Sequence, residues 1–325
     1  MAVYTEVDDD ALAALLAQYD IGDAVSCKGI AEGVENSNYL LATTRGQYII
    51  TLYEKRVKAG DLPFFLGLME HLAAKGLACP TPIKGRDGQS LREVAGRPAA
   101  IISFLQGVWP RRPTAQHCAG VGAALAQFHV LGADFPLRRA NALSTDGWRA
   151  LLESTAARAD EVRPGLAQDL AREFDSLQTA WPEFGQARYV PTGVIHADLF
   201  PDNVFFLGDR VSGIIDFYFA CNDFLAYDVA IALNAWCVET TGEFNVTTAR
   251  LLLQQYRAVR PLSDSEIHTL PLFCRGAALR FLLTRLHDWL HPAPGAMVKP
   301  KNPMEYLQKL NFHRAALGPG AYGLD

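Results

Sequence analysis

The sequence predicts an α+β protein with a small β-rich first lobe and a larger helical second lobe. Residues 24–54 and 85–105 carry β-branched and aromatic side chains in short runs between turn residues, a pattern typical of strands. The segment "QGVWPRRPT", residues 106–114, interrupts this pattern with one glycine and two prolines. Beyond it, apolar residues recur mainly at helical spacing. We therefore expect a first lobe at residues 1–105 and a second lobe at residues 106–325.

The first lobe is expected to hold five strands and an inserted helix. A helix within residues 8–22 is indicated by leucines spaced at helical intervals, and three strands should follow in residues 24–54. Residues 61–76 predict the inserted helix, with Asp61 as its N-cap. Two further strands are expected in residues 85–105, the second strongly apolar.

The second lobe should be mainly helical. A helix is expected to begin at Thr114, and others at about residues 226–238 and 247–259. Ser263 and Glu266 form a capping-box pattern at the start of a long helix that extends to about residue 290.

Composition favours a globular protein that acts on a small molecule. Half of the 325 residues are hydrophobic, which suffices for a substantial core. The net charge of -5 arises from interspersed charges, so we expect no nucleic acid and no anionic membrane as a partner. The six cysteines form no C-x-x-C pair and are expected to be reduced thiols. The amino end does not resemble a signal peptide, and the apolar runs are too short to span a membrane, so we expect a cytoplasmic protein.

The segment "HADLFPDN", residues 196–203, concentrates the polar groups that predict chemistry. An apolar hairpin with its turn at residues 208–209 follows it. In simple two-residue register this hairpin brings Asp198, Asn203 and Asp216 to one end. Hard oxygen ligands in that number suit Mg²⁺, which is usually shared with substrate phosphates.

Three interpretations compete for this segment. A plain polar turn explains any single Asp or Asn in it. A metallohydrolase site would use His196, Asp198 and Asp202 as ligands, but it needs more histidines than the neighbouring sequence supplies. The order H-x-D-x-x-x-x-N followed by D-F matches the kinase signatures, in which the first Asp accepts a hydroxyl proton while the Asn and the later Asp hold the metal. The kinase interpretation is favoured.

The chain resembles the kinase-like phosphotransferases of the aminoglycoside and choline kinase superfamily, and within it the bacterial homoserine kinases. The resemblance covers nearly the whole chain and is carried by the segments "GIAEGVENSNYLL", "DLPFF", "HADLFPDNV", "GIIDFYFAC", "YDVAIALNAWC" and "RFLLTRL". It implies a protein-kinase-like two-lobed fold and ATP and Mg²⁺ as cofactors. It also implies phosphorylation of the side-chain hydroxyl of L-homoserine in threonine biosynthesis. A kinase for another small amino alcohol or antibiotic, or a catalytically silent nucleotide-binding scaffold, remains the alternative.

The resemblance also implies residue roles. Asp198 would be the catalytic base, Asn203 and Asp216 would bind Mg²⁺, and His196 would be a structural prop of the loop. Asp228 is expected to cap the helix that follows it or to prop the same loop. The residues expected near the nucleotide are Gly29, Gly33, Asn36, Asn38, Glu70, Ser103, Phe104 and Leu105, the last three through their backbone groups.

Phosphate neutralisation is the point at which this chain departs from the superfamily. Thr51 occupies the strand position where kinases generally carry a lysine that pairs with a helix glutamate, here Glu70. The homoserine kinase branch shares this departure. Lys55 or Arg56 could reach the phosphates instead, whereas a disabling departure would favour the silent scaffold.

The acceptor site is expected to need a cation, because homoserine carries a carboxylate. Arginine binds a carboxylate through two parallel hydrogen bonds. Arg280, which opens "RFLLTRL", is the first candidate and Arg285 the second. Asn234 and Trp236 could also face the acceptor, although Trp236 as a core residue is equally consistent with the pattern.

Overall fold

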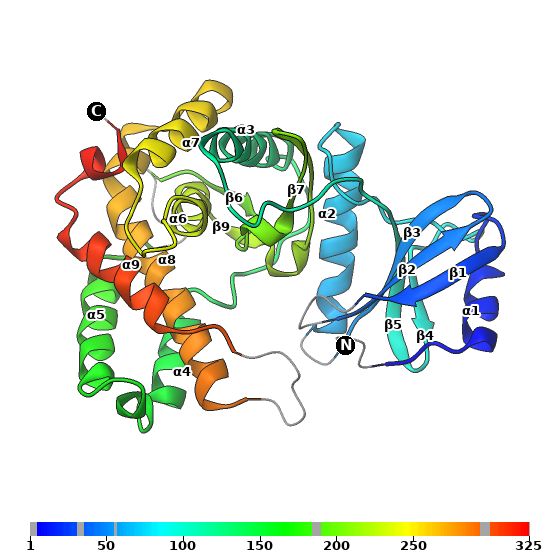
Figure 1. The fold of residues 1–325 in the computed structure, drawn as a ribbon, viewed down its shortest axis with the longest axis horizontal. Coiled ribbons are helices and arrows are strands. Elements are labelled where there is room, and N and C mark those ends of the chain that lie inside the picture. The colour runs from blue at the N-terminus through cyan, green and yellow to red at the C-terminus, as the bar shows by residue number, and fades with distance from the viewer. Residues whose placement is uncertain (1–4, 31–35, 55–56, 184–189, 293–299, 325) are drawn as a thin grey trace. The chain divides into compact units, whose positions relative to one another are not determined.

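The computed structural model describes residues 5–30, 36–54, 57–183, 190–292 and 300–324. They form two compact units. The first unit comprises the described chain up to Gly107 together with Phe135–Leu137 and Ser212–Tyr218, and the second unit comprises the rest. Figure 1 shows a β-sheet in the first unit and mainly helices in the second.

The first unit is built on one antiparallel sheet with the strand order β1-β2-β3-β5-β4. The strands are β1 (Ala24–Gly29), β2 (Ser37–Thr43), β3 (Gly46–Leu52), β4 (Leu91–Val94) and β5 (Arg97–Ser103). Helix α1 (Asp9–Leu16) packs against alternate buried side chains of the central strands, such as Leu41 and Ile50. The five predicted strands are confirmed, whereas the first helix is shorter than predicted because it ends at Leu16.

Helix α2 (Leu62–Ala74) is the predicted inserted helix, preceded by a short 3₁₀ turn (Ala59–Asp61). Pro63 lies in its first turn, where an N–H would have no partner within the helix. Asp61 occupies the predicted N-cap position, although its side chain makes no capping hydrogen bond. Gly76, with φ 90°, allows the chain to turn after the helix.

Seven helices form most of the described second unit. They are α3 (Ala115–Leu131), α4 (Thr145–Thr155), α5 (Leu166–Ala180), α6 (Leu225–Trp236), α7 (Val246–Val259), α8 (Asp264–Leu290) and α9 (Met304–Ala315). The predicted capping box of Ser263 and Glu266 begins α8, and Thr114 caps α3. Helices α3 and α7 approach closely because Gly122 lacks a Cβ, which would lie 2.1 Å from the carbonyl oxygen of Leu252.

Four short strands frame the segment that the sequence singled out. Strand β6 (Thr192–Ile195) pairs antiparallel with β9 (Cys221–Phe224), and α6 follows β9 directly. Strands β7 (Val204–Leu207) and β8 (Arg210–Ile214) form the predicted hairpin. The pairing of β6 with β9 was not predicted, because nothing in these short apolar runs specifies a partner more than twenty residues away.

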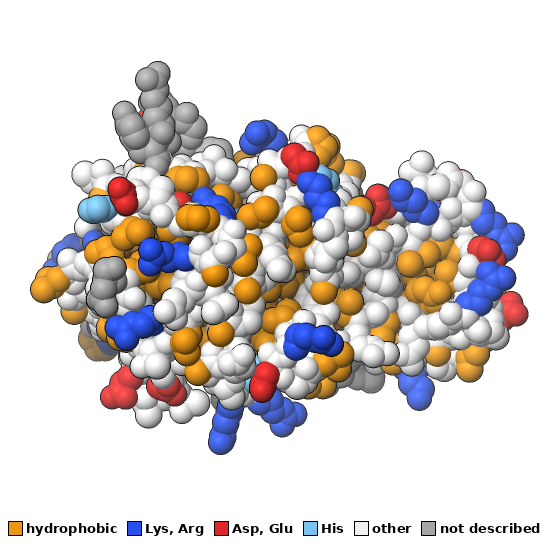
Figure 2. Space-filling view, turned by 90° about the horizontal axis from the view of Figure 1, so that it is seen from above, with side chains coloured by type: hydrophobic (Ala, Val, Ile, Leu, Met, Phe, Trp, Pro, Cys, Tyr) orange, Lys and Arg blue, Asp and Glu red, His pale blue; other side chains and the backbone are white. Residues whose placement is uncertain are grey.

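On the face drawn in Figure 2, Lys and Arg side chains stand singly or in small groups among Asp and Glu. Within the described residues, no helix is both long and apolar enough to cross a membrane.

Candidate active site

The Asp198 loop, residues 196–203, begins where β6 ends. Ile195 is in register with Cys221 of β9, which fixes the start of the loop in the core of the second unit. A short 3₁₀ turn at Pro201–Asn203 closes the loop and leads into β7. His196 and Ala197 are fully buried, whereas Asp198 is only half-buried. Of these three residues, Asp198 is therefore the one that can meet a substrate.

Asn203 holds Asp198 from within the same loop. Its Nδ2 donates to the carbonyl oxygen of Asp198 at 2.8 Å and to the carboxylate Oδ2 at 3.2 Å. Both amide hydrogens therefore face Asp198, and Oδ1 is the atom of Asn203 that remains for a cation. A neutral hard oxygen in this place fits an Mg²⁺ ligand.

His196 supports the loop. Its ring is buried, and its Nδ1 accepts a hydrogen bond from the backbone N–H of Asp198 at 3.3 Å. This contact confirms the expected role as a structural prop. The described residues contain no group of three His, Cys, Asp or Glu side chains that could hold a metal ion, so the metallohydrolase interpretation has no support there.

Asp228, on the first turn of α6, binds the backbone of the Asp198 loop. Its two carboxylate oxygens accept hydrogen bonds from the backbone N–H of His196 at 2.7 Å and of Ala197 at 2.9 Å. Burial acts to raise the pKa of Asp228, but the hydrogen bond from His129 and these further contacts leave it below its usual value. The expected role as a prop of the loop is confirmed.

His129 of α3 extends this support and was missed by the sequence reasoning. Its ring lies 3.1 Å from the carboxylate of Asp228 through Nε2 and 2.7 Å from the hydroxyl of Tyr256 through Nδ1. The only signal in the sequence was a histidine on an otherwise apolar helix face, which is usual for a satisfied core residue.

Two residues predicted to face the acceptor, Asn234 and Trp236, bond to groups of the core, and acceptor contact by either stays a prediction. Asn234 is fully buried, and its side chain bonds to the carbonyl oxygens of Ala230 and Cys274 and to the ring of His313. Trp236 is also buried, and its indole N–H donates to the carbonyl oxygen of Leu199 at 2.7 Å. Both side chains satisfy polar groups of the core, which the helical pattern alone could not reveal.

Arg280 and Arg285 have different surroundings. Arg280 is 2% exposed and donates through Nη1 to the carbonyl oxygen of Ala197. Arg285 pairs with Glu305 at 2.7 Å, and its guanidinium lies 4.6 Å from the ring centroid of Tyr306. Acceptor binding by either arginine stays a prediction.

Two lysines join Arg285 near the loop. Lys301 lies 3.8 Å from the carboxylate of Asp202 and 5.8 Å from the ring centroid of Phe200, both in the Asp198 loop. Lys309 lies 4.3 Å from the ring centroid of Tyr306, and burial lowers its pKa to about 8. The Tyr306 hydroxyl is buried and has no hydrogen-bond partner in the described parts of the chain. Three cations therefore lie on this side of the loop, two of them paired with Glu305 and Asp202.

The first unit contains the residues predicted to lie near the nucleotide. It also contains Asp216, one of the two predicted metal ligands. Asp216, which follows β8, has a left-handed backbone with φ 63°. Gly29 ends β1 and is exposed. Asn36 is buried, and its Oδ1 accepts from the N–H of Glu54 at 3.4 Å. Gly33, like Lys55 and Arg56, lies outside the described residues.

Thr51 fills the position of the missing lysine with a local contact. It is paired with Asn38 across β2 and β3, and its hydroxyl donates to Asn38 Oδ1 at 2.8 Å. Asn38 therefore has a structural partner, and phosphate binding by its side chain remains a prediction.

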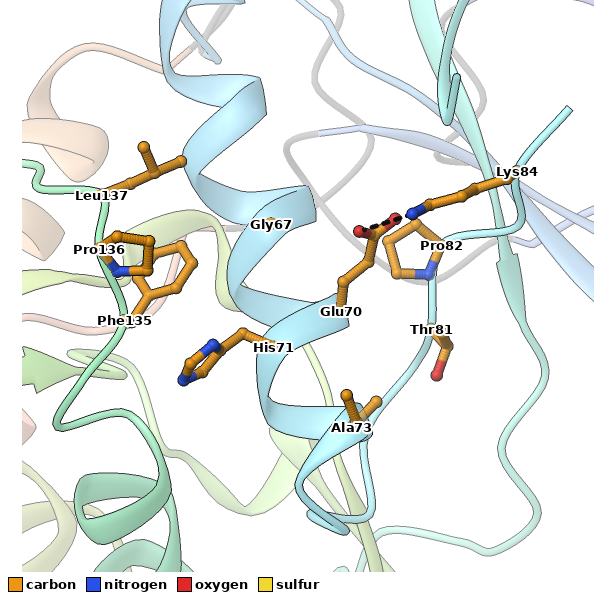
Figure 3. A pocket seen from close by; sticks show the side chains of 11 residues that line it. Gly67, Glu70, His71, Ala73, Thr81, Pro82, Lys84, Phe135, Pro136 and Leu137 are labelled. Atoms are coloured by element: carbon orange, nitrogen blue, oxygen red, sulfur yellow. Dashed lines mark ion pairs between the residues drawn. The ribbon is translucent and has the colours of Figure 1, made fainter. Parts of the chain in front are cut away.

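Glu70 of α2 has a cationic partner from an unexpected place. Figure 3 shows its carboxylate directed at Lys84. The Lys84 ammonium lies 3.3 Å from this carboxylate, and in the sequence Lys84 falls between α2 and β4. Ser90 donates to the same carboxylate at 3.1 Å. The glutamate of the helix is thus paired, although β3 supplies no lysine. Lys84 stands in an irregular segment, where the sequence carries no periodicity that would have marked it.

The backbone groups predicted to lie near the nucleotide, those of Ser103, Phe104 and Leu105, are partly engaged in other hydrogen bonds. The N–H of Ser103 donates to the carbonyl oxygen of Thr81 at 2.9 Å, and its hydroxyl accepts from the N–H of Thr81. Phe104 is exposed and Leu105 half-buried. The N–H of Ser103 is therefore not available to adenine, while the roles of Phe104 and Leu105 stay predictions.

Comparison with known proteins decides the family. The phosphotransferase enzyme family matches residues 26–262, more than half of the chain. The chain belongs to the phosphotransferase enzyme family. A curated relative from Paramagnetospirillum magneticum, named homoserine kinase, is 64% identical over the full length of both chains. Another of that name from Rhodospirillum rubrum is 62% identical, again over both full lengths.

The solved structures support the fold of a phosphotransferase of this family. An amicoumacin kinase in complex with AMP-PNP, Ca²⁺ and Ami has a TM-score of 0.73 to this chain, and the match covers 96% of this chain and 95% of that chain at 15% identity. At this identity the likeness bears on the fold alone. The expected kinase-like phosphotransferase fold and the family resemblance are confirmed.

Proposed function

We propose that this phosphotransferase is a homoserine kinase that transfers the γ-phosphoryl group of ATP to the side-chain hydroxyl of L-homoserine. The observation that carries the proposal is the half-buried Asp198 held by Asn203, in a chain that matches curated homoserine kinases over its full length. The products would be ADP and O-phospho-L-homoserine.

In the proposed reaction, Asp198 accepts the proton and neighbouring side chains keep it in position. The hydroxyl oxygen of homoserine attacks the γ-phosphorus, the bond to the ADP oxygen breaks, and the hydroxyl proton passes to the Asp198 carboxylate. The two hydrogen bonds from Asn203 keep that carboxylate in place. Asp228 fixes the backbone of His196 and Ala197, the two residues that precede Asp198.

Mg²⁺ is proposed as the metal, with Asn203 and Asp216 as its protein ligands. The proposal rests on the order of the motif and on the amide oxygen of Asn203 that remains after its Nδ2 has bonded to Asp198. When bound, the ion would neutralise charge on the phosphates.

The charge beside the loop favours an acceptor with a carboxylate. Arg285, Lys301 and Lys309 gather around Tyr306 and Phe200, whereas an acceptor with only an amine would add a like charge to this group. We propose that the homoserine carboxylate is bound here, with Arg285 as the forked donor.

The direct test is product identification. The purified protein is incubated with ATP, Mg²⁺ and L-homoserine, and ³¹P NMR is used to follow the new phosphomonoester. Asp198→Asn is the control, because the amide keeps the shape of the side chain but cannot accept the proton. ATP hydrolysis without a phosphomonoester, or full activity of the control variant, would refute the assignment.

A further inference from the structure

Ala197, the residue before the proposed base, has a left-handed backbone with φ 64°. A side chain with a Cβ disfavours this conformation. Ala95 has it as well, but there a two-residue turn between β4 and β5 demands it. Ala197 lies in no such turn, so other contacts must hold its backbone.

Two buried charged side chains form hydrogen bonds with the backbone of Ala197. Its N–H donates to Oδ1 of Asp228 at 2.9 Å, and its carbonyl oxygen accepts from Nη1 of Arg280. Asp228 is fully buried and Arg280 is 2% exposed. Charged partners make stronger hydrogen bonds than neutral ones, most of all away from water.

Arg280 is itself held in place. Its guanidinium lies 4.3 Å from the ring centroid of Phe281 and 5.7 Å from that of Phe219. Within the described residues its Nε has no hydrogen-bond partner, and its charge also acts on the buried Asp223 carboxylate and Tyr227 hydroxyl. The carbonyl oxygen of Ala197 is the backbone acceptor to which Nη1 of this cation donates.

We propose that Arg280 is a positioning residue: together with Asp228 it keeps Ala197 left-handed and so directs the Asp198 carboxylate at the acceptor hydroxyl. The inference rests on the proposed role of Asp198. It differs from the acceptor role predicted from the sequence, because loss of a positioning residue lowers kcat, whereas loss of a carboxylate ligand raises the KM for homoserine.

The test uses the strain at Ala197. Arg280→Met is expected to lower kcat by about 10- to 100-fold with little change in the KM for ATP, since small misplacements of a catalytic group have effects of this size. Ala197→Gly removes the steric penalty of the left-handed backbone. Added to Arg280→Met, it should restore at least about half of the lost kcat on a logarithmic scale. The Ala197→Gly single variant supplies the reference for this comparison.

Arg158→Met is the matched control. Arg158 also donates to a backbone carbonyl, that of Leu290 at the end of α8, but not to the Asp198 loop. Its loss should leave kcat unchanged and should not respond to Ala197→Gly. If Arg280→Met fails to fold, Arg280→Lys, which keeps the charge, takes its place in the same comparison.

Two outcomes overturn the inference. A raised KM for homoserine at unchanged kcat would make Arg280 an acceptor ligand. A kcat loss that Ala197→Gly does not relieve would make Arg280 a general support of the core. Failure of the homoserine kinase assignment is distinguishable from both, because the wild type would then yield no phosphohomoserine at all.

Discussion

Single residues around Asp198 combine chemical and structural tasks. Asn203 shows this most clearly, since one end of its amide holds Asp198 while the other is proposed to bind Mg²⁺. The sequence motif predicted the residue types, because kinase chemistry requires a base and oxygen ligands at this spacing. It did not reveal the support from His129 and Arg280, because both come from helices distant in sequence, whereas the supporting role of Asp228 was expected.

The two tasks of Asn203 can be separated with Asn203→Asp. The new carboxylate keeps an oxygen for the metal but loses both hydrogen bonds to Asp198 and places a like charge beside it. We expect kcat to fall by at least about tenfold, while the Mg²⁺ concentration for half-maximal activity does not rise. Asp216→Ala should do the opposite and raise that concentration. Mg²⁺ titrations of both variants check this, and the same response in both would argue against separate tasks.

Whole elements position these residues, and their predictability follows from the range of the interactions. The strands of the first unit and the start of α8 were predicted, because alternation and capping are local signals. The pairing of β6 with β9, and the membership of Phe135–Leu137 and Ser212–Tyr218 in the first unit, were not. These depend on contacts between segments whose sequences carry no mark of their partners.

The end of α9 carries a pH-dependent contribution to stability. Burial, and then the charge of Lys309, lowers the pKa of His313 to about 3. The unfolded chain takes up this proton near the usual value of about 6.5, while the folded protein does not. Stability should therefore fall as pH drops from about 6.5 toward 3, with a slope of up to about 1.4 kcal/mol per pH unit.

Urea unfolding of the wild type and of His313→Gln at several pH values measures this contribution. The glutamine amide can still meet Asn234 and Tyr322, the partners of the histidine ring, but it does not titrate. The wild type should lose stability relative to the variant as the solution is acidified. Parallel curves for the two proteins would show that His313 is not the group responsible.

At the scale of the whole molecule, family membership and the chemistry of one loop lead to the same function. The family residues expected at the nucleotide belong to the first unit, and the proposed base belongs to the second. Fold alone does not choose the acceptor, because kinases with this fold act on different small molecules. The choice of homoserine rests on the full-length relatives and on the cations around Tyr306.

The acceptor preference tests this choice most directly. The kcat/KM for L-homoserine is compared with that for 3-aminopropan-1-ol, which has the same hydroxyl and amine but lacks the carboxylate. We predict a preference for homoserine of at least about 100-fold, because the largely buried Arg285 would lose the carboxylate that it is proposed to bind. Equal use of the two acceptors would contradict the homoserine kinase assignment and leave only a phosphotransferase for small alcohols.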